Sequence, residues 1–282
     1  MNMDGALLPF EDEHFHGSFK SYFAAKRGAA FNTIKAFPEI WSGFEMLDAL
    51  WSRSLDILTP TDDQKRILPA LLFFNAHARM RIAFELAFSR CFPEALGTLR
   101  SAIESAAYGY QFTYVPYEFP KLSSPSDPGV TPKTEQERKK LTRQIKAEFN
   151  KRKKRLFEPE CNLGQLEGFW RMCSERGSHL TFQAVTLRAL RQGETVNVTD
   201  RHLTFLYSDA PRDVTQALLT WFLECGYTMH VLLYKSFESR LKLDYELPRL
   251  SGEFRQVREN VVQQLKASVS DKRHLGAPIA SR

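Results

Sequence analysis

The sequence lacks the features that mark a disulfide-stabilised or membrane-spanning protein. It has four cysteines, and the closest two, Cys161 and Cys173, are 12 residues apart, which fits neither a CxxC pair nor a zinc ribbon. The most apolar stretch, residues 217–237, is interrupted by Glu224 and Lys235, whereas a spanning helix needs about 20 nearly uncharged residues. We therefore expect reduced cysteines, a buried core helix over 217–237 and no association with a membrane.

Signals for secretion and for the common cofactors are absent as well. The first 16 residues carry acidic side chains where a signal peptide needs a basic flank and an apolar run. No GxxxxGK[ST], GxGxxG, HExxH, GxSxG or EF-hand motif occurs. His14 and His16 form the only close histidine pair, and two imidazoles fall short of the three or four ligands of a zinc site. We expect a cytoplasmic protein that holds no metal and no cofactor.

What the sequence does contain is helical periodicity in a globular composition. Hydrophobic residues make up 43% of the 282 residues and charged residues 26%, which is typical of a folded chain. Apolar residues recur at spacings of three and four, and strand alternation is scarce. The pattern predicts a mostly α fold, a single helical domain over residues 1–282 in which long helices pack antiparallel.

Proline and glycine divide this domain into segments. Helices are predicted over 33–57, 61–88, 93–114, 133–156, 164–176, 179–191, 211–243 and 253–269. The helices 61–88 and 93–114 should pair as an antiparallel hairpin across a short turn at residues 91–92, because the small residues of 93–114 allow close approach. Residues 115–132 contain five prolines and predict a loop, and residues 270–282 predict a flexible tail. Residues 195–207 are compatible with one small β-hairpin.

The positive charge is concentrated in one predicted helix. Residues 133–155 hold eleven Lys and Arg against three Glu, whereas the rest of the chain has 28 basic and 30 acidic side chains. Thr134 and Glu137 can cap this basic helix (133–156), and Ile145 and Phe149 lie on a sparse apolar stripe.

Such a cluster suits contact with phosphate groups, because cationic side chains gain affinity by releasing counterions. The candidate nucleic-acid-binding residues are Lys139, Lys140, Arg143, Lys146, Lys151, Arg152, Lys153, Lys154 and Arg155. Alternatively, the cluster is a solvated helix face whose cations complement the C-terminal end of the helix dipole.

Two polar groups stand out on other predicted helices. Arg100 and Glu104 are four residues apart among small and apolar residues, which favours either a polar pocket between helices or a simple ion pair at an exposed edge. His179 follows Arg176 at a predicted helix start, where the imidazole could act as a base and the guanidinium could bind an anion. The alternative is a surface histidine beside a capping serine.

These segments resemble helical bacterial proteins related to the HEPN superfamily. The resemblance covers about residues 65–190 and rests on Leu99-Arg100-Ser101-Ala102-Ile103-Glu104 and on Ser174 followed by His179. It implies a helical bundle, often dimeric, and for some relatives metal-independent RNA cleavage in defence systems through an Arg-x(4 to 6)-His motif. Here Arg176 stands only three positions before His179.

We therefore expect a nucleic-acid-binding or nucleotide-binding helical protein. RNA or another polyanion would contact the basic helix, and a homodimer is expected from the resemblance. If RNA is cleaved, His179 would activate the ribose hydroxyl, and Arg176 or Arg100, beside Glu104, would stabilise the developing charge without a metal. The alternative is a non-catalytic interaction protein that dimerises through the helix 211–243 or docks an acidic partner on the basic helix.

Overall fold

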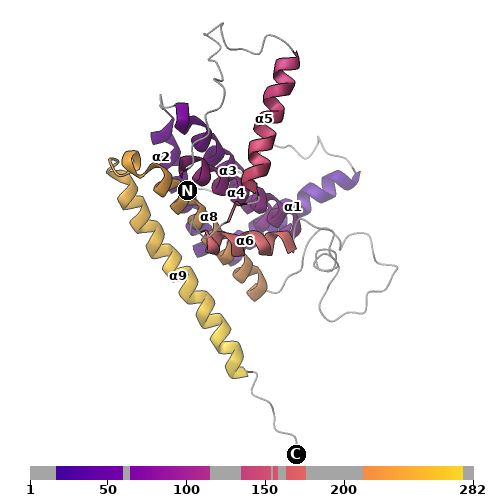
Figure 1. Cartoon of the computed structure of the whole chain (residues 1–282). Helices are drawn as coiled ribbons and strands as arrows, with labels where there is room; N and C mark the ends of the chain where they lie inside the picture. Colours follow the sequence, from indigo (N-terminus) through magenta and orange to yellow (C-terminus); the bar gives the residue numbers. More distant parts are fainter. Residues whose placement is uncertain are drawn as a thin grey trace, which may run out of the picture.

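The computed structural model describes residues 17–59, 64–114, 135–153, 155–157, 163–175 and 212–275, and all regular elements within them are helices. These are α1 (Gly17–Ala36), α2 (Pro38–Leu58), α3 (Gln64–Phe88), α4 (Phe92–Tyr114), α5 (Glu135–Lys153), α6 (Gly164–Cys173), α8 (Arg212–Leu241) and α9 (Glu246–Leu275) (Figure 1). The mostly α bundle predicted from the sequence is confirmed. The predicted proline-rich loop at 115–132 and the hairpin near 195–207 lie outside the described residues.

The centre of the bundle is the hairpin of α3 and α4. At the turn between them Arg90 has a φ of 61°. The backbone N–H of Cys91 donates to the carbonyl of Leu86 at 2.8 Å, and that of Arg90 donates to the carbonyl of Ala87 at 3.0 Å. This pair of bonds satisfies the last carbonyls of α3 and reverses the chain. The helices then pack antiparallel along their length, as their small residues and the short turn predicted.

Helices α2 and α8 pack against this hairpin around Trp51. The indole of Trp51 is fully buried, and its N–H donates to the carbonyl of Gly226 in α8 at 3.2 Å. A Cβ atom on Gly226 would lie 2.8 Å from Leu47 and 3.0 Å from both Met80 and Phe84. Helix α8 therefore approaches α2 and α3 this closely only because residue 226 has no side chain.

Helix α8 is an internal element. It contacts α2, α3, α4, α6 and α9, and its buried residues face several directions around its axis. The predicted core helix is thus confirmed, and much of its surface packs against other helices of the same chain. No helix in the described ranges is long and apolar enough to cross a membrane.

The largest differences from the predicted helix boundaries lie at α1–α2 and at α9. The helix expected from residue 33 is divided, because Phe37 separates α1 from α2 and Pro38 opens α2 at a position where its missing N–H costs nothing. Helix α9 begins at Glu246, before Pro248, and continues to Leu275, into the predicted flexible tail (270–282). Its early start has a local cause, since the Asp244 carboxylate accepts the backbone N–H groups of Glu246 and Leu247, each at 2.9 Å.

Replacing Gly226 tests whether the close approach of α8 holds the core together. We expect Gly226→Ala to lower the free energy of unfolding by about 1–3 kcal/mol, because the new methyl group overpacks a full core. Gly252→Ala is the matched control, since Gly252 also lies within a helix but a Cβ there meets nothing within 4 Å. Urea denaturation followed by circular dichroism measures both. An unchanged midpoint for Gly226→Ala would contradict the packing described here.

Candidate nucleic-acid interface

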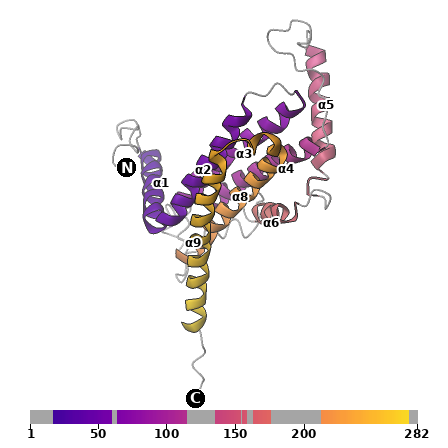
Figure 2. The ribbon, with the colours of Figure 1, turned by 90° about the vertical axis from the view of Figure 1, so that its left-hand side faces the viewer.

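Helix α5 projects from the rest of the bundle in both views (Figures 1 and 2). It is anchored through its C-terminal half, where the Phe149 ring lies 5.0 Å from that of Tyr108 and 5.3 Å from that of Phe112. The Tyr108 hydroxyl donates to the Phe149 carbonyl at 3.3 Å. Phe149, one residue of the apolar stripe predicted for the basic helix, therefore attaches α5 to α4.

Arg152 belongs to this anchor and not to the exposed surface. Its side chain is 10% exposed, and its Nε donates to Glu148 at 2.8 Å. The guanidinium also lies 4.0 Å from the centre of the Phe112 ring, a cation–π contact. Among the residues predicted to bind nucleic acid, Arg152 thus differs from expectation, because its charge is already neutralised and buried inside the protein.

The remaining cations lie on the opposite side of α5. One face of α5 carries four of these cations and one amide, at spacings of four, three, four and three. All five residues are exposed: Lys139, Arg143, Lys146, Asn150 and Lys153. This face is about 21 Å long at 1.5 Å per residue.

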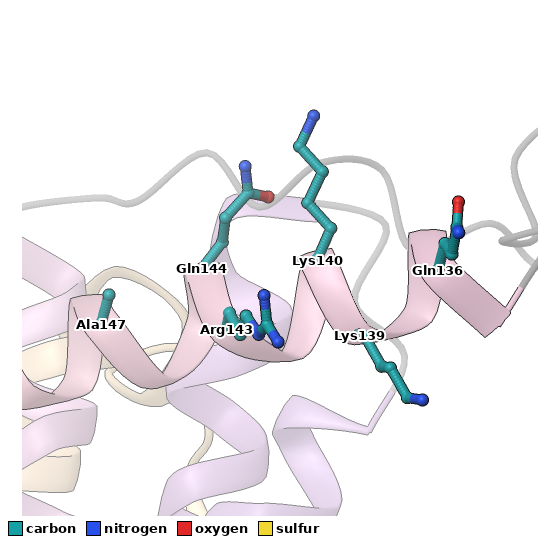
Figure 3. A pocket seen from close by; sticks show the side chains of 6 residues that line it. All are labelled: Gln136, Lys139, Lys140, Arg143, Gln144 and Ala147. Carbon is teal, nitrogen blue, oxygen red and sulfur yellow. The ribbon is translucent and has the colours of Figure 1, made fainter.

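Further exposed cations widen this surface. Lys140 and Lys151 flank the line, and Figure 3 shows Lys140 and Gln144 extending to one side of α5 and Lys139 to the other. A hollow along the helix is lined by Gln136, Lys139, Lys140, Arg143, Gln144 and Ala147. We call Lys139, Lys140, Arg143, Lys146, Lys151 and Lys153 the basic face.

Among the described residues, few acidic side chains pair with the basic face. Lys139 lies 3.8 Å from Glu135, in a pair whose side chains are both about two-thirds exposed. The other five cations form no ion pair with any residue in the described part of the chain. Arg155 is exposed just beyond α5, and its carbonyl accepts a 2.7 Å bond from Gln111 of α4, whereas Lys154 lies outside the described residues.

Arg100 and Glu104 form a polar cluster with Trp170 of α6. Arg100 donates to Glu104 at 3.1 Å, and the Trp170 indole N–H donates to the same carboxylate oxygen at 2.9 Å. The Arg100 guanidinium lies 4.8 Å from the Trp170 ring centre. Burial, together with the Glu104 charge, raises the pKa of nearby Tyr108 to about 12. The cluster is a satisfied contact between α4 and α6, and the other two predicted catalytic residues, Arg176 and His179, lie outside the described residues.

A second polar group joins α2 to α3. Asp48 accepts Nε and a terminal nitrogen of Arg81 at 2.6 and 2.8 Å, and His77 contacts the same carboxylate at 2.8 Å. Hydrogen bonds from His77 and Arg81 outweigh burial and hold the pKa of Asp48 well below its usual range. The four-residue spacing of His77 and Arg81 was visible in the sequence, but their partner lies 29 positions or more away along the chain.

A buried histidine lies on the inner side of this group. His230 Nε2 is 2.9 Å from the Ser54 hydroxyl, which itself donates to the carbonyl of Leu50. The hydroxyl oxygen must then accept from His230, so the imidazole carries its proton on Nε2. Complete burial lowers the pKa of His230 to about 3, which keeps the ring neutral.

The described residues supply no site for a metal ion. Nowhere among them do three His, Cys, Asp or Glu side chains gather in a way that could hold one. Cys91, Cys173 and Cys225 are buried thiols that form no disulfide with one another. Burial raises the pKa of Cys173 to about 12, and the pKa of Cys225 is raised for the same reason, so these two thiols are poor nucleophiles.

The chain matches no protein-family model, and neither curated proteins nor solved structures include one significantly similar to it. The candidate interface therefore rests on the geometry and charge of this chain.

Removing the Glu104 carboxylate tests the polar cluster. Glu104→Ala deletes the acceptor shared by Trp170 and Arg100, and we expect it to lower the free energy of unfolding by about 1–3 kcal/mol. Glu167→Ala is the control: Glu167 pairs with Arg171 on the surface of α6, where an i,i+4 pair contributes only about 0.2–0.5 kcal/mol. Equal losses in urea denaturation would show that the cluster contributes no more than a surface ion pair.

The buried His230 predicts a dependence of stability on pH. Because the folded-state pKa of about 3 lies below the ordinary value of 6.5, the unfolded chain takes up the proton first as the solution is acidified. Stability is therefore greatest above pH 6.5 and falls by up to about 1.4 kcal/mol per pH unit between pH 6.5 and 4. In His230→Gln this contribution is absent. Urea titrations across that range measure the difference in slope, and identical slopes for both proteins would refute the assignment.

Proposed function

We propose that this protein binds nucleic acid through the basic face of α5. One observation carries the proposal: six exposed cations cover the side of α5 that faces away from its apolar anchor. Five of them have no ion-pair partner among the described residues. A polyanion placed there gains Coulomb attraction and counterion release while little protein charge is desolvated.

The distribution of charge along the chain supports binding at α5 in particular. The formal net charge is +6, yet residues 133–155 contain eleven of the 39 basic side chains and only three of the 33 acidic ones. The remainder of the protein is slightly acidic. Electrostatic attraction would thus steer a nucleic acid toward α5, because the remainder of the protein offers no comparable excess of positive charge.

The side chains on α5 favour contact with the phosphate backbone over stacking with bases. Phe149 is the only aromatic residue of α5, and its ring packs on Tyr108 and Phe112. Binding of single strands usually relies on exposed aromatic side chains as stacking platforms. We therefore expect a duplex to bind more tightly than a single strand of the same length, with weak dependence on sequence.

Cleavage is not required by this proposal. Arg100 and Glu104 hold α6 against α4, and the basic face lies on a different helix. Metal-independent RNA cleavage, which the HEPN resemblance implies, remains the catalytic alternative. It predicts that RNA is degraded on a denaturing gel by the wild type and is left intact by His179→Ala at equal stability.

Neutralising part of the basic face tests the proposal. The triple variant Lys139→Gln, Arg143→Gln, Lys146→Gln should bind duplex DNA and RNA more weakly at low salt. Three lost phosphate contacts should also reduce the slope of log K against log salt by about 2–3. Fluorescence anisotropy at several salt concentrations measures both quantities.

The matched control removes the same charge elsewhere. Lys235, Lys242 and Arg255 are exposed on or next to α8 and α9, and their triple Gln variant should retain the wild-type slope. An equal loss of affinity in both variants would mean that binding depends on the net charge of the protein and not on the basic face. Absence of any salt-dependent binding by the wild type would refute the proposal and would favour an acidic protein partner for α5.

A further inference from the structure

Helix α3 carries a line of apolar side chains on its outer surface. Ile67, Leu71, Phe74 and Ile82 are 40%, 58%, 37% and 51% exposed, respectively, and Ala78 between them is also exposed. Their spacings of four, three, four and four place all five on one face of the helix. We call these five residues the α3 row.

The α3 row is distinct from the side of α3 that builds the core. Phe73, Ala76 and Met80 are completely buried on the inner side. Single exposed apolar residues are common on protein surfaces, but an aligned group of this kind marks an interaction site. The row itself contains no charged residue, and the nearest ions, Arg81 and Glu85, are paired with Asp48 and Lys26.

Polar groups border the α3 row on both sides, and they are already satisfied. Toward α4, the Asn75 side-chain amide donates to the Ser105 hydroxyl at 2.7 Å. Toward α2, Arg81 makes its two bonds with Asp48 and a third, of 3.1 Å, with Ser52. An apolar centre with a hydrogen-bonded polar rim is the usual composition of a protein–protein interface.

We propose that the α3 row is the contact surface between two copies of this chain, with the two α3 helices antiparallel. Four of the five positions pair about one midpoint, and Phe74 lies beside it. Ile67 and Ile82 are equally distant from the midpoint between Phe74 and Asn75, and so are Leu71 and Ala78. A two-fold axis at this midpoint sets Ile67 opposite Ile82 of the partner subunit and the large Leu71 opposite the small Ala78 of the partner subunit. Such reciprocal pairing is what an isologous interface requires.

The size of the row sets the strength of the expected dimer. From Ile67 to Ile82 the row extends over about 22 Å, and a strip of that length and about 10 Å wide covers roughly 220 Å². This area is less than the roughly 800 Å² per partner of a standard interface. The dimer should therefore dissociate on dilution. This inference is independent of nucleic-acid binding by α5, and it moves the expected dimer contact from residues 211–243 to α3.

Light scattering coupled to size-exclusion chromatography tests the oligomeric state. Over a concentration series, the wild type should approach twice the chain mass of 32.5 kDa. Leu71→Asp should raise the dissociation constant by about tenfold or more, because a carboxylate would be buried opposite Ala78 of the partner subunit. Leu243→Asp is the matched control, since Leu243 is 79% exposed just beyond α8, and it should dimerise as the wild type does.

Cysteine crosslinking tests the antiparallel arrangement. In a Cys161→Ser background, Phe74→Cys lies next to the proposed axis and should crosslink to its own copy with a short bis-maleimide. Ile67→Cys lies at the far end of the row and should not, but it should crosslink when mixed with Ile82→Cys. A wild type that stays monomeric at every concentration, a dimer unaffected by Leu71→Asp, or crosslinking through Ile67→Cys alone would each overturn the proposal.

Discussion

The contact between Trp51 and the backbone of Gly226 is the constraint on which the rest of this bundle depends. The indole N–H reaches a carbonyl in the middle of α8, which is possible only because residue 226 presents no side chain to α2 and α3. The same indole stacks on His77 at 5.3 Å and meets the edge of His230 at 5.6 Å. One side chain of α2 therefore positions α3 and α8 together, and the two histidines that it contacts, His77 and His230, are hydrogen-bonded to Asp48 and Ser54.

Helix α4 connects this core to α5 and so positions the basic face. It is buried along most of its length against α3, α6 and α8, and Gly109 brings its backbone so close to Phe73 that a Cβ there would be 2.9 Å from the ring. From this fixed position, Tyr108 and Phe112 hold Phe149 of α5. The basic face then points outward because the apolar side of the same helix is anchored. The direction of the charge is set by hydrophobic packing and not by the charges themselves.

The molecule consequently presents two surfaces of opposite character. The basic face on α5 suits a polyanion, and the α3 row suits an apolar surface like itself. A dimer formed through α3 would carry two copies of α5, and two basic faces on one particle would raise the effective concentration for a long polyanion. The two proposals thus address different surfaces, yet both depend on the α3–α4 hairpin.

The sequence by itself determined the helical class, the antiparallel pairing of α3 and α4, and the location of the positive charge, because periodicity, proline and glycine positions and charge counts act over a few residues. It did not reveal α1 or the early start of α9, which Asp244 supports through bonds to backbone N–H groups. Only the tertiary structure decided that Arg152 is buried on Phe112, that Asp48 joins His77 and Arg81, and that Arg100, Glu104 and Trp170 meet. These contacts join residues on different helices, and whether a charged side chain faces water or a partner depends on which helix lies beside it.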